Sequence, residues 1–341
     1  MKKIRLEEAV GHILCHDMTK IIPGEFKGPA FKKGHLIQEE DIPELLKLGK
    51  ENIYVWENKP GMLHEDEAAI RMGRAAAGEN IRLSEPGEGK VNFFSTIHGL
   101  LKINVTALHY VNSIEEIIMA TLHTNRVVNK DFLVAGTRVI PLVINEEKIV
   151  QVEEICRQAG GIIQVIPFRN LTAGIVVSGS EVYQGRIKDS FSPVVRRKVE
   201  AFNCRIIHQV VVPDDKFLIA GAVREMLAKG AGLILITGGM SIDPDDLTPA
   251  AVKSLGANLV TYGAPVLPGA MFLLAYLGEV PVMGLPGCVM YAKTTIFDLV
   301  LPRVLAGEKL TREEIIAIGH GGLCLSCTNC NFPHCSLGKG A

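Results

Sequence analysis

The stretch GLILITGGMSIDPDDLTPAAVKSLG, residues 232–256, decides the fold. It begins with a short continuous run of apolar residues, turns through two glycines, and continues as a helix-like pattern that ends at Gly256. A continuous apolar run is typical of a strand that is buried on both faces, and a helix that follows it covers one of those faces. The stretch therefore predicts one strand–turn–helix unit of a parallel sheet.

The same alternation extends in both directions from this unit. Further short apolar runs, many of them β-branched, occur at 173–179, 205–212, 257–263, 271–277 and 279–287. Amphipathic, helix-like segments alternate with them at 189–203, 214–230, 246–256 and 288–307. This order predicts an α/β domain over residues 169–307, a doubly wound and mainly parallel sheet with helices on both faces, whose core ends near Leu305.

The rest of the chain predicts smaller units. Residues 1–60 indicate a small β-rich N-terminal unit with a short helix over 42–48. Residues 61–168 indicate an α+β domain of unassigned role. Its predicted helices cover 64–78, 113–122 and 146–160, the second beginning at a capping box made by Ser113 and Glu116, while 107–111 is expected to be a strand. Residues 308–341 form a Cys-rich tail.

Composition excludes several classes of protein. The 341 residues include 36 Lys and Arg against 37 Asp and Glu, a net charge of −1, which argues against a nucleic-acid surface. A hydrophobic content of 48% excludes disorder. No stretch supplies about 20 unbroken apolar residues, and the N-terminus lacks a signal-peptide pattern. We therefore expect a cytoplasmic protein that binds neither membrane nor nucleic acid.

Three glycine-rich turns, at 178–185, 237–246 and 285–288, follow predicted strands. Parallel sheets bind ligands beyond the carboxyl ends of their strands. Glycines allow a ligand to approach the backbone closely, and the helix N-termini that follow offer N–H groups to an anion. Ordinary turns are the alternative for any one of the three. Together they favour a phosphate- or pterin-like ligand.

Several of these segments resemble one known family. TGGMSIDPDDLTPAAV (237–252) is similar to the signature of the molybdopterin-binding domain of molybdenum-cofactor biosynthesis, on Gly238, Gly239, Ser241, Asp246, Thr248 and Pro249. SGSEVYQGRIKDS (178–190) resembles the first turn of that family, and VVVPDD (210–215) its strand that ends in an aspartate pair. LPGC and the helix after it resemble the closing element of molybdopterin molybdenumtransferases. The resemblance covers about residues 170–307.

The resemblance implies a function and a set of site residues. It implies binding of (adenylated) molybdopterin and insertion of molybdate with Mg²⁺, as a transferase. Asp246 and Asp189 are the implied catalytic residues, and Asp246 is the Mg²⁺ ligand, with Asp243 and Asp245 as possible helpers. The implied substrate-binding residues are Gly179, Ser180, Glu181, Gly185, Ser190, Gly238, Gly239, Met240, Ser241, Thr248, Pro286, Gly287 and Cys288.

Departures from the family pattern leave other functions open. Ser180 replaces an aspartate, Phe191 an asparagine, and Cys288 with Val289 an Asn-Pro pair; Asp245 stands where adenylyltransferases have arginine. A non-catalytic carrier or sensor of the cofactor, which delivers it to a molybdoenzyme client, is therefore the alternative. A nucleotide pyrophosphatase is a weaker one. A homo-oligomer is compatible with all three.

Some of these residues also have a purely structural interpretation. Asp246 opens a helix-like segment and is a candidate N-cap, and the cap interpretation is favoured for Asp214 and Asp215. Cys288 is either a functional thiol, because a thiolate is favoured at a helix start, or a small buried apolar residue.

The tail carries four cysteines within twelve residues, Cys324, Cys327, Cys330 and Cys335, spaced C-x2-C-x2-C-x4-C. In a reducing compartment this density favours a metal centre over disulfides. The first three spacings match a run that binds iron–sulfur clusters, so a [4Fe–4S] cluster is favoured over Zn²⁺ bound by four cysteines, or by three with His334 or His320. A flexible, oxidation-prone tail is the alternative.

Overall fold

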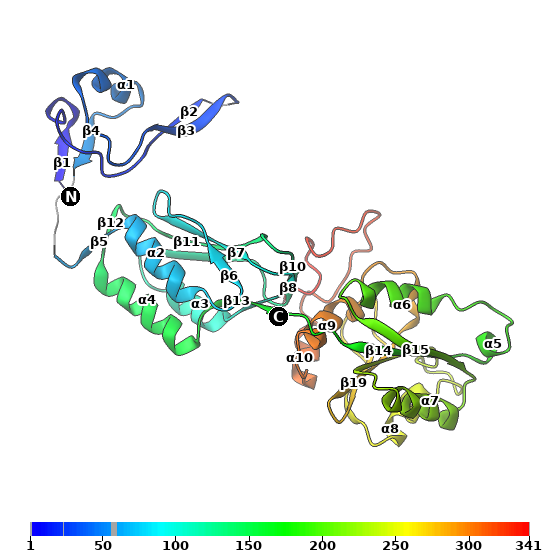
Figure 1. The fold of residues 1–341 in the computed structure, drawn as a ribbon. Coiled ribbons are helices and arrows are strands. Elements are labelled where there is room, and N and C mark those ends of the chain that lie inside the picture. Colours follow the sequence, from blue (N-terminus) through cyan, green and yellow to red (C-terminus); the bar gives the residue numbers. More distant parts are fainter. Residues whose placement is uncertain (1, 23, 56–59, 341) are drawn as a thin grey trace. The chain divides into compact units, whose positions relative to one another are not determined.

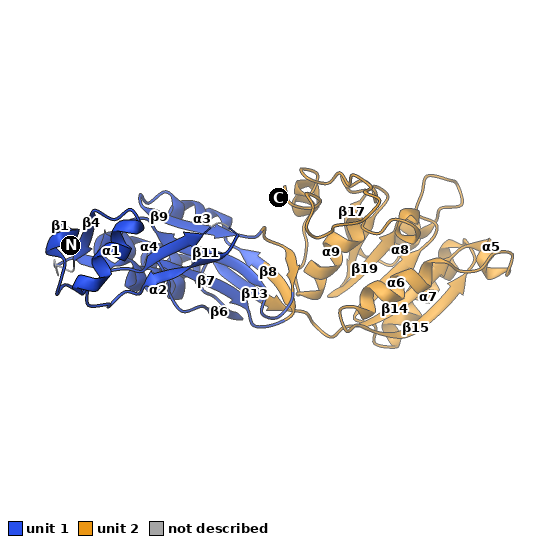
Figure 2. Cartoon of the chain, turned by 90° about the horizontal axis from the view of Figure 1, so that it is seen from above, with its two compact units in different colours: residues 1–97, 102–122, 129–165 blue, residues 98–101, 123–128, 166–341 orange. Residues whose placement is uncertain are grey.

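The structure is a computed structural model that describes residues 2–22, 24–55 and 60–340. The chain divides into two compact units (Figure 2). Unit 1 comprises residues 1–97, 102–122 and 129–165, and unit 2 comprises residues 98–101, 123–128 and 166–341. Both contain helices and strands, so the predicted mixed α/β class is confirmed.

The first part of unit 1 is a small β-rich element. Strand β1 (Lys2–Arg5) pairs with β4 (Asn52–Val55), and β2 (Met18–Ile22) forms a hairpin with β3 (Phe26–Phe31). The helical segments are η1 (Leu6–Glu8), η2 (Glu39–Asp41) and α1 (Ile42–Lys47). The predicted short helix is α1, which ends before Gly49 because that residue has a positive φ of 75°.

The remainder of unit 1 packs helices on a four-stranded antiparallel sheet. Its order is β6 (Ile81–Leu83), β7 (Lys90–Ser95), β11 (Leu133–Val139), β9 (Ile117–Thr121). The pair β5 (Met62–His64) and β12 (Val143–Asn145) leads into α2 (Glu65–Ala76) and α4 (Glu146–Ala159), which contact each other. Both helices match the predicted segments, and Gly160 ends α4 in the left-handed conformation, with φ 68°. Strand β13 (Ile163–Pro167) lies mainly in unit 1, whereas β10 (Arg126–Val128) and most of β8 (Gly99–Ile103) belong to unit 2.

The predicted helix over 113–122 is wrong, as is the strand over 107–111. Residues Val105–Asn112 form helix α3, Ser113 is its C-cap, and Ile117–Thr121 form strand β9. The side chains of β9 alternate between buried and exposed positions, and the strand pairs with β11. Both oxygen and nitrogen of the Asn112 side chain bond the backbone of Met119, which joins the helix end to the strand.

Unit 2 is built on a six-stranded sheet (Figure 1). Its order is β15 (Arg205–Val212), β14 (Thr172–Ser178), β16 (Leu233–Thr237), β19 (Val280–Leu285), β18 (Leu273–Leu277), β17 (Asn258–Tyr262). The first four strands are parallel, and the last two run antiparallel to their neighbours. All six coincide with apolar runs found in the sequence. The four inner strands are almost wholly buried, which explains their continuous apolar runs, whereas the edge strands β15 and β17 are only partly buried.

Helices cover both faces of this sheet. Ile175 and Leu235 point to one face, where they share a core with α6 (Phe191–Glu200) and α9 (Ile296–Leu305). Val176 and Ile236 point to the other, where they share a core with α7 (Lys216–Ala228) and α8 (Thr248–Ser254). Figure 1 shows α6 and the pair α7 and α8 on opposite sides of β14 and β15. The shorter helices are α5 (Ser180–Tyr183), η3 (Gly287–Met290) and α10 (Arg312–Ala317).

The helix expected over 288–307 begins late. Residues 287–290 form only the 3-10 turn η3, and α9 starts at Ile296. Thr295 and Asp298 form a capping box that fixes this start, since the Thr295 side chain accepts from the Phe297 N–H and the Asp298 carboxylate accepts from the Thr295 N–H.

The core of unit 2 does not end near Leu305, as the sequence predicted. Leu310, Ile315, Ile318 and Leu337 are buried in it, so the tail packs on the domain. Within the part of the chain that the structure describes, no helix is both long and apolar enough to span a bilayer.

Candidate functional site

The three glycine-rich turns lie along one edge of the sheet in unit 2. Val177 of β14 pairs with Thr237 of β16, which in turn pairs with Leu285 of β19. Because these strands are parallel, the turns that follow them leave the sheet side by side. The first two turns touch: a Cβ on Gly238 would lie 1.9 Å from the carbonyl oxygen of Ser178. Only glycine fits there, at a φ of 85°.

The Gly-Gly turn is held by Thr248 at the start of α8. The Thr248 hydroxyl donates to the Gly238 carbonyl at 2.9 Å, and its N–H donates to the Gly239 carbonyl at 3.2 Å. From the other side, the Tyr262 hydroxyl donates to the carbonyls of Met240 (3.2 Å) and Ser241 (3.0 Å). Burial, and then the Asp246 carboxylate, raises the pKa of Tyr262, so this donor keeps its proton.

The turn then exposes a run of acidic residues. Ser241, Asp243 and Asp245 are exposed, and Asp246 is half-buried. The Asp246 carboxylate Oδ2 accepts from the Asp243 N–H at 3.1 Å, whereas α8 begins at Thr248 without a side-chain cap. Asp246 therefore folds the turn and does not cap the helix, which is a correction to the cap interpretation.

The first turn is organised by Asp214. Its carboxylate accepts from the Ser178 hydroxyl at 2.7 Å and from the Ser180 N–H at 2.8 Å, while the Ser180 hydroxyl accepts from the Asp214 N–H at 3.2 Å. Sequence reasoning favoured a cap for both aspartates, but only Asp215 is one: it accepts from the N–H groups of Phe217 and Leu218. Asp214 instead joins the ends of β14 and β15.

Asp189 lies just before α6, and both of its carboxylate oxygens accept hydrogen bonds. Its Oδ1 accepts from the N–H groups of Phe191 (2.9 Å) and Ser192 (3.0 Å), and its Oδ2 accepts from the Gln209 side chain at 3.3 Å. Asp189 precedes the N-cap, Ser190, and its bonds to the first N–H groups of α6 and to Gln209 leave its oxygens less accessible to a metal ion than those of Asp246. Ser190, Gly185 and Glu181 lie in the exposed part of the same turn.

The third turn places Pro286, Gly287 and Cys288 after β19. Gly287 is exposed, and Cys288 is half-buried in η3. Burial raises the pKa of the Cys288 thiol, which disfavours the thiolate that a helix start would have stabilised. Met240 is buried in the core, where it packs against Gly284, so only its backbone faces the edge.

Two buried hydroxyls near this edge were not foreseen from the sequence. Among the residues that the structure describes, the hydroxyls of Thr237, at the end of β16, and Ser192, in the first turn of α6, have no hydrogen-bond partner. For Thr237 the sequence does contain a usable signal, because this small polar residue ends an otherwise apolar strand. Asp214 and Tyr262 were also missed as supports, because the contacts that define them join segments distant in sequence.

The four tail cysteines lie around one cavity of about 330 Å³ in unit 2, together with residues 291–294. Cys330 Sγ is 3.5 Å from the Thr294 hydroxyl, and this hydrogen bond lowers the pKa of the Cys330 thiol. Searched over the described residues, no three His, Cys, Asp or Glu side chains converge tightly enough to hold a single ion. All eight cysteines are free thiols.

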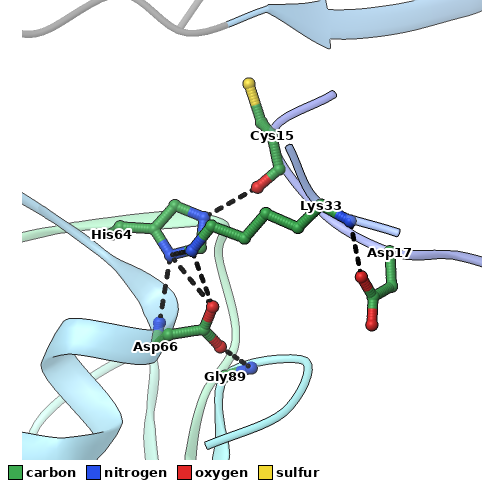
Figure 3. Close-up of polar contacts among 6 residues, drawn as sticks. All are labelled: Cys15, Asp17, Lys33, His64, Asp66 and Gly89. Carbon is green, nitrogen blue, oxygen red and sulfur yellow. Dashed lines mark hydrogen bonds and ion pairs between the residues drawn. The ribbon is translucent and has the colours of Figure 1, made fainter. Parts of the chain in front are cut away.

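Unit 1 contains a separate polar cluster, centred on His64 (Figure 3). His64 is buried; its Nε2 lies 2.9 Å from the Cys15 carbonyl and its Nδ1 lies 3.0 Å from Lys33 Nζ. Lys33 Nζ also donates to Asp66 at 2.7 Å. Burial, followed by the Asp66 carboxylate, raises the pKa of the neighbouring Glu65 to about 7.

Two known families match parts of the chain. Residues 174–306 match the family described as "Probable molybdopterin binding domain", and residues 3–57 match a domain of unknown function, DUF8806. The first match covers all three glycine-rich turns and stops before the cysteine tail.

Curated relatives agree with the first match. A molybdopterin molybdenumtransferase of Synechococcus elongatus is 24% identical over 51% of this chain and 46% of its own length. One of Haemophilus influenzae is 27% identical over 44% of this chain and 39% of its own length. The chain thus spans less than half the length of these relatives. A solved tungsten cofactor synthesizing protein MoaB of Pyrococcus furiosus is 21% identical, covers 42% of this chain and 98% of its own, and has a TM-score of 0.35.

The six-stranded sheet and its helices form an α/β domain. Over residues 174–306 the family match and the curated relatives support a molybdopterin-binding domain of molybdenum-cofactor biosynthesis, as the motifs predicted.

Proposed function

We propose that the chain binds molybdopterin, or its adenylated form, at the edge formed by the three turns, and that it catalyses insertion of molybdate. One observation carries the proposal: the turns at 178–185, 237–246 and 285–288, which match the family motifs, end three adjacent parallel strands. The ligand then lies across the carboxyl end of the sheet, as in other parallel sheets.

The phosphate end of the ligand is assigned to the Gly-Gly turn. Gly239, Met240 and Ser241 follow the strand directly, and the Ser241 hydroxyl is exposed beside them. The carbonyls of these three residues accept from the Thr248 N–H and the Tyr262 hydroxyl, and we assign their peptide N–H groups to the anion. The unpartnered Thr237 hydroxyl supplies a further donor at the strand end.

Asp246 fits the Mg²⁺ that the family implies. Among the contacts of the described residues only one of its oxygens is engaged, by the Asp243 N–H, and Asp243 and Asp245 lie exposed in the same turn. Carboxylate oxygens are the ligands that Mg²⁺ prefers, and a bound ion neutralises phosphate charge. We assign Asp246 as the metal-holding residue and give Asp189 a positioning role, since one of its oxygens accepts from the start of α6 and the other from Gln209 of β15.

A non-catalytic carrier is the second candidate. It is favoured by Ser180, whose N–H and hydroxyl are both bonded to Asp214, at the position where the family has a carboxylate. A carrier needs the turns that bind the ligand, but it does not need the catalytic carboxylate that Ser180 replaces in the first turn.

Release of AMP from adenylated molybdopterin on addition of molybdate, with Mg²⁺ present, tests the proposal. We expect turnover by the wild-type chain and at least a hundredfold loss in Asp246→Ala. Glu279→Ala is the control, because this exposed carboxylate precedes β19, at the opposite end of that strand from the site; its rate should stay within about twofold of wild type.

Each outcome separates the candidates. Tight binding without AMP release in the wild type supports the carrier. Hydrolysis of free dinucleotides without any dependence on molybdate supports a nucleotide pyrophosphatase. Equal loss of activity in Glu279→Ala and Asp246→Ala, or full activity in Asp246→Ala, would contradict the specific assignment of Asp246.

A further inference from the structure

The four cysteines of the tail are among the residues that line one cavity of unit 2. Cys324, Cys327, Cys330 and Cys335 all line the same volume of about 330 Å³. The rest of the wall includes five apolar side chains, those of Pro268, Leu323, Leu325, Phe332 and Leu337, together with polar residues such as Thr294 and Asn331. Four thiols spread over twelve residues of chain have therefore been gathered around one site.

The tail is anchored on the body of unit 2. The N–H of Cys324 donates to the Leu267 carbonyl at 2.8 Å, and the Leu267 N–H donates to Gly322 at 2.9 Å. In the middle of the cysteine run, the Thr328 carbonyl lies 3.5 Å from Lys293 Nζ. Leu337, only 4% exposed, is buried in the domain core. These contacts hold both ends of the cysteine run, which argues against a flexible tail.

The side chains that line the cavity favour a metal centre that prefers sulfur ligands. The side chains around the cavity that bind metals well are the four thiols, and thiolates select Zn²⁺, Cu(I) or iron–sulfur clusters. The Lys293 side chain is also part of the wall, and its positive charge offsets the charge of four thiolates.

Size and spacing distinguish a cluster from one ion. Four thiolates at about 2.3 Å from a single Zn²⁺ fill the space between them and need no cavity. A cavity of about 330 Å³ instead leaves room for the iron and sulfide of a cluster. The C-x2-C-x2-C start of the run has the spacing of cluster-binding segments.

We propose that Cys324, Cys327, Cys330 and Cys335 bind an iron–sulfur cluster of the [4Fe–4S] type in this cavity. Each thiol loses its proton when it ligates iron. The wall residues 291–294 follow the turn at 285–288 directly in the chain, so the cluster site and the molybdopterin edge are joined by one short segment.

Metal and sulfide analysis of the full chain, purified without oxygen, tests the proposal. We expect about four iron and four acid-labile sulfide per chain, with a broad visible absorption that bleaches on reduction. Cys327→Ser and Cys330→Ser, at exposed positions, should lose most of the iron. Cys156→Ala, which removes a buried thiol of unit 1, is the control and should keep it.

A second measurement uses only the wild-type chain, so it tests the proposal even if the cysteine variants fold poorly. In the wild-type chain, the four tail thiols should resist alkylation until a chelator removes the iron. About one zinc per chain without sulfide would overturn the proposal, as would a metal-free chain whose tail thiols all react in the native state. Iron content does not depend on pterin binding. The cluster proposal can therefore fail while the molybdopterin proposal holds, and the reverse.

Discussion

At the residue scale, Gly238 is the position that most strictly constrains the site. A side chain there meets the Ser178 carbonyl at 1.9 Å and must adopt a φ of 85°. We expect Gly238→Ala to destabilise unit 2 by at least about 3 kcal/mol, because the clash adds to the cost of the left-handed conformation. Urea denaturation followed by circular dichroism measures this.

Gly256 provides the control for Gly238. Its φ is 75°, but no atom lies within 4 Å of the Cβ that alanine would add. Gly256→Ala should therefore lower the free energy of unfolding only by the cost of a left-handed backbone at alanine, about 1–2 kcal/mol. Equal losses for the two variants would show that the contact between the first two turns does not constrain the fold.

Glu65 is a residue whose charge state makes stability depend on pH. Its ordinary pKa is 4.5, and burial followed by the Asp66 carboxylate raises it to about 7. Between these values the folded protein holds a proton that the unfolded chain has released, so stability should fall as pH rises from about 4.5 to 7. Glu65→Gln should flatten this part of the profile of unfolding free energy against pH. In the control Glu67→Gln, at an exposed site on the same helix, the profile should match wild type.

At the scale of elements, Asp214 and Asp215 are adjacent residues with different structural roles. Asp215 caps α7, so Asp215→Ala should cost about 1 kcal/mol and leave molybdopterin affinity unchanged. Asp214 joins Ser178 and Ser180 across the site edge, so Asp214→Ala should weaken binding at least tenfold. Calorimetric titration with molybdopterin compares the two variants; an equal loss of affinity in both would contradict the distinction.

Most strands of unit 2 could be predicted from sequence, because a strand buried on both faces leaves a continuous apolar run. The helix predicted over 113–122 was wrong, because Ser113 and Glu116 have the spacing of a capping box but Ser113 ends α3. There, short apolar runs suit either structure, and pairing of β9 with β11 decides between them. The start of α9 was missed although Thr295 and Asp298 show the spacing of a capping box. The turns of the site could be located by their glycines, but the contacts of Asp214 and Tyr262 join distant segments and leave no local pattern.

At the scale of the whole molecule, the tail belongs to the core of unit 2. Leu337 is 4% exposed, whereas Leu325 in the same tail is 75% exposed. We expect Leu337→Ala to destabilise unit 2 by about 2–4 kcal/mol and Leu325→Ala to change stability by less than about 0.5 kcal/mol. Urea denaturation compares them, and an unaffected Leu337→Ala would mean that the tail does not pack on the domain in solution.

The central claim is that the edge of three turns binds molybdopterin. The most direct test is a calorimetric titration of the full chain with adenylated molybdopterin, followed by competition with molybdopterin and with a nicotinamide dinucleotide. The account predicts saturable binding of one ligand per chain that molybdopterin displaces and the dinucleotide does not. No binding by a folded chain, or displacement by the dinucleotide alone, would contradict it.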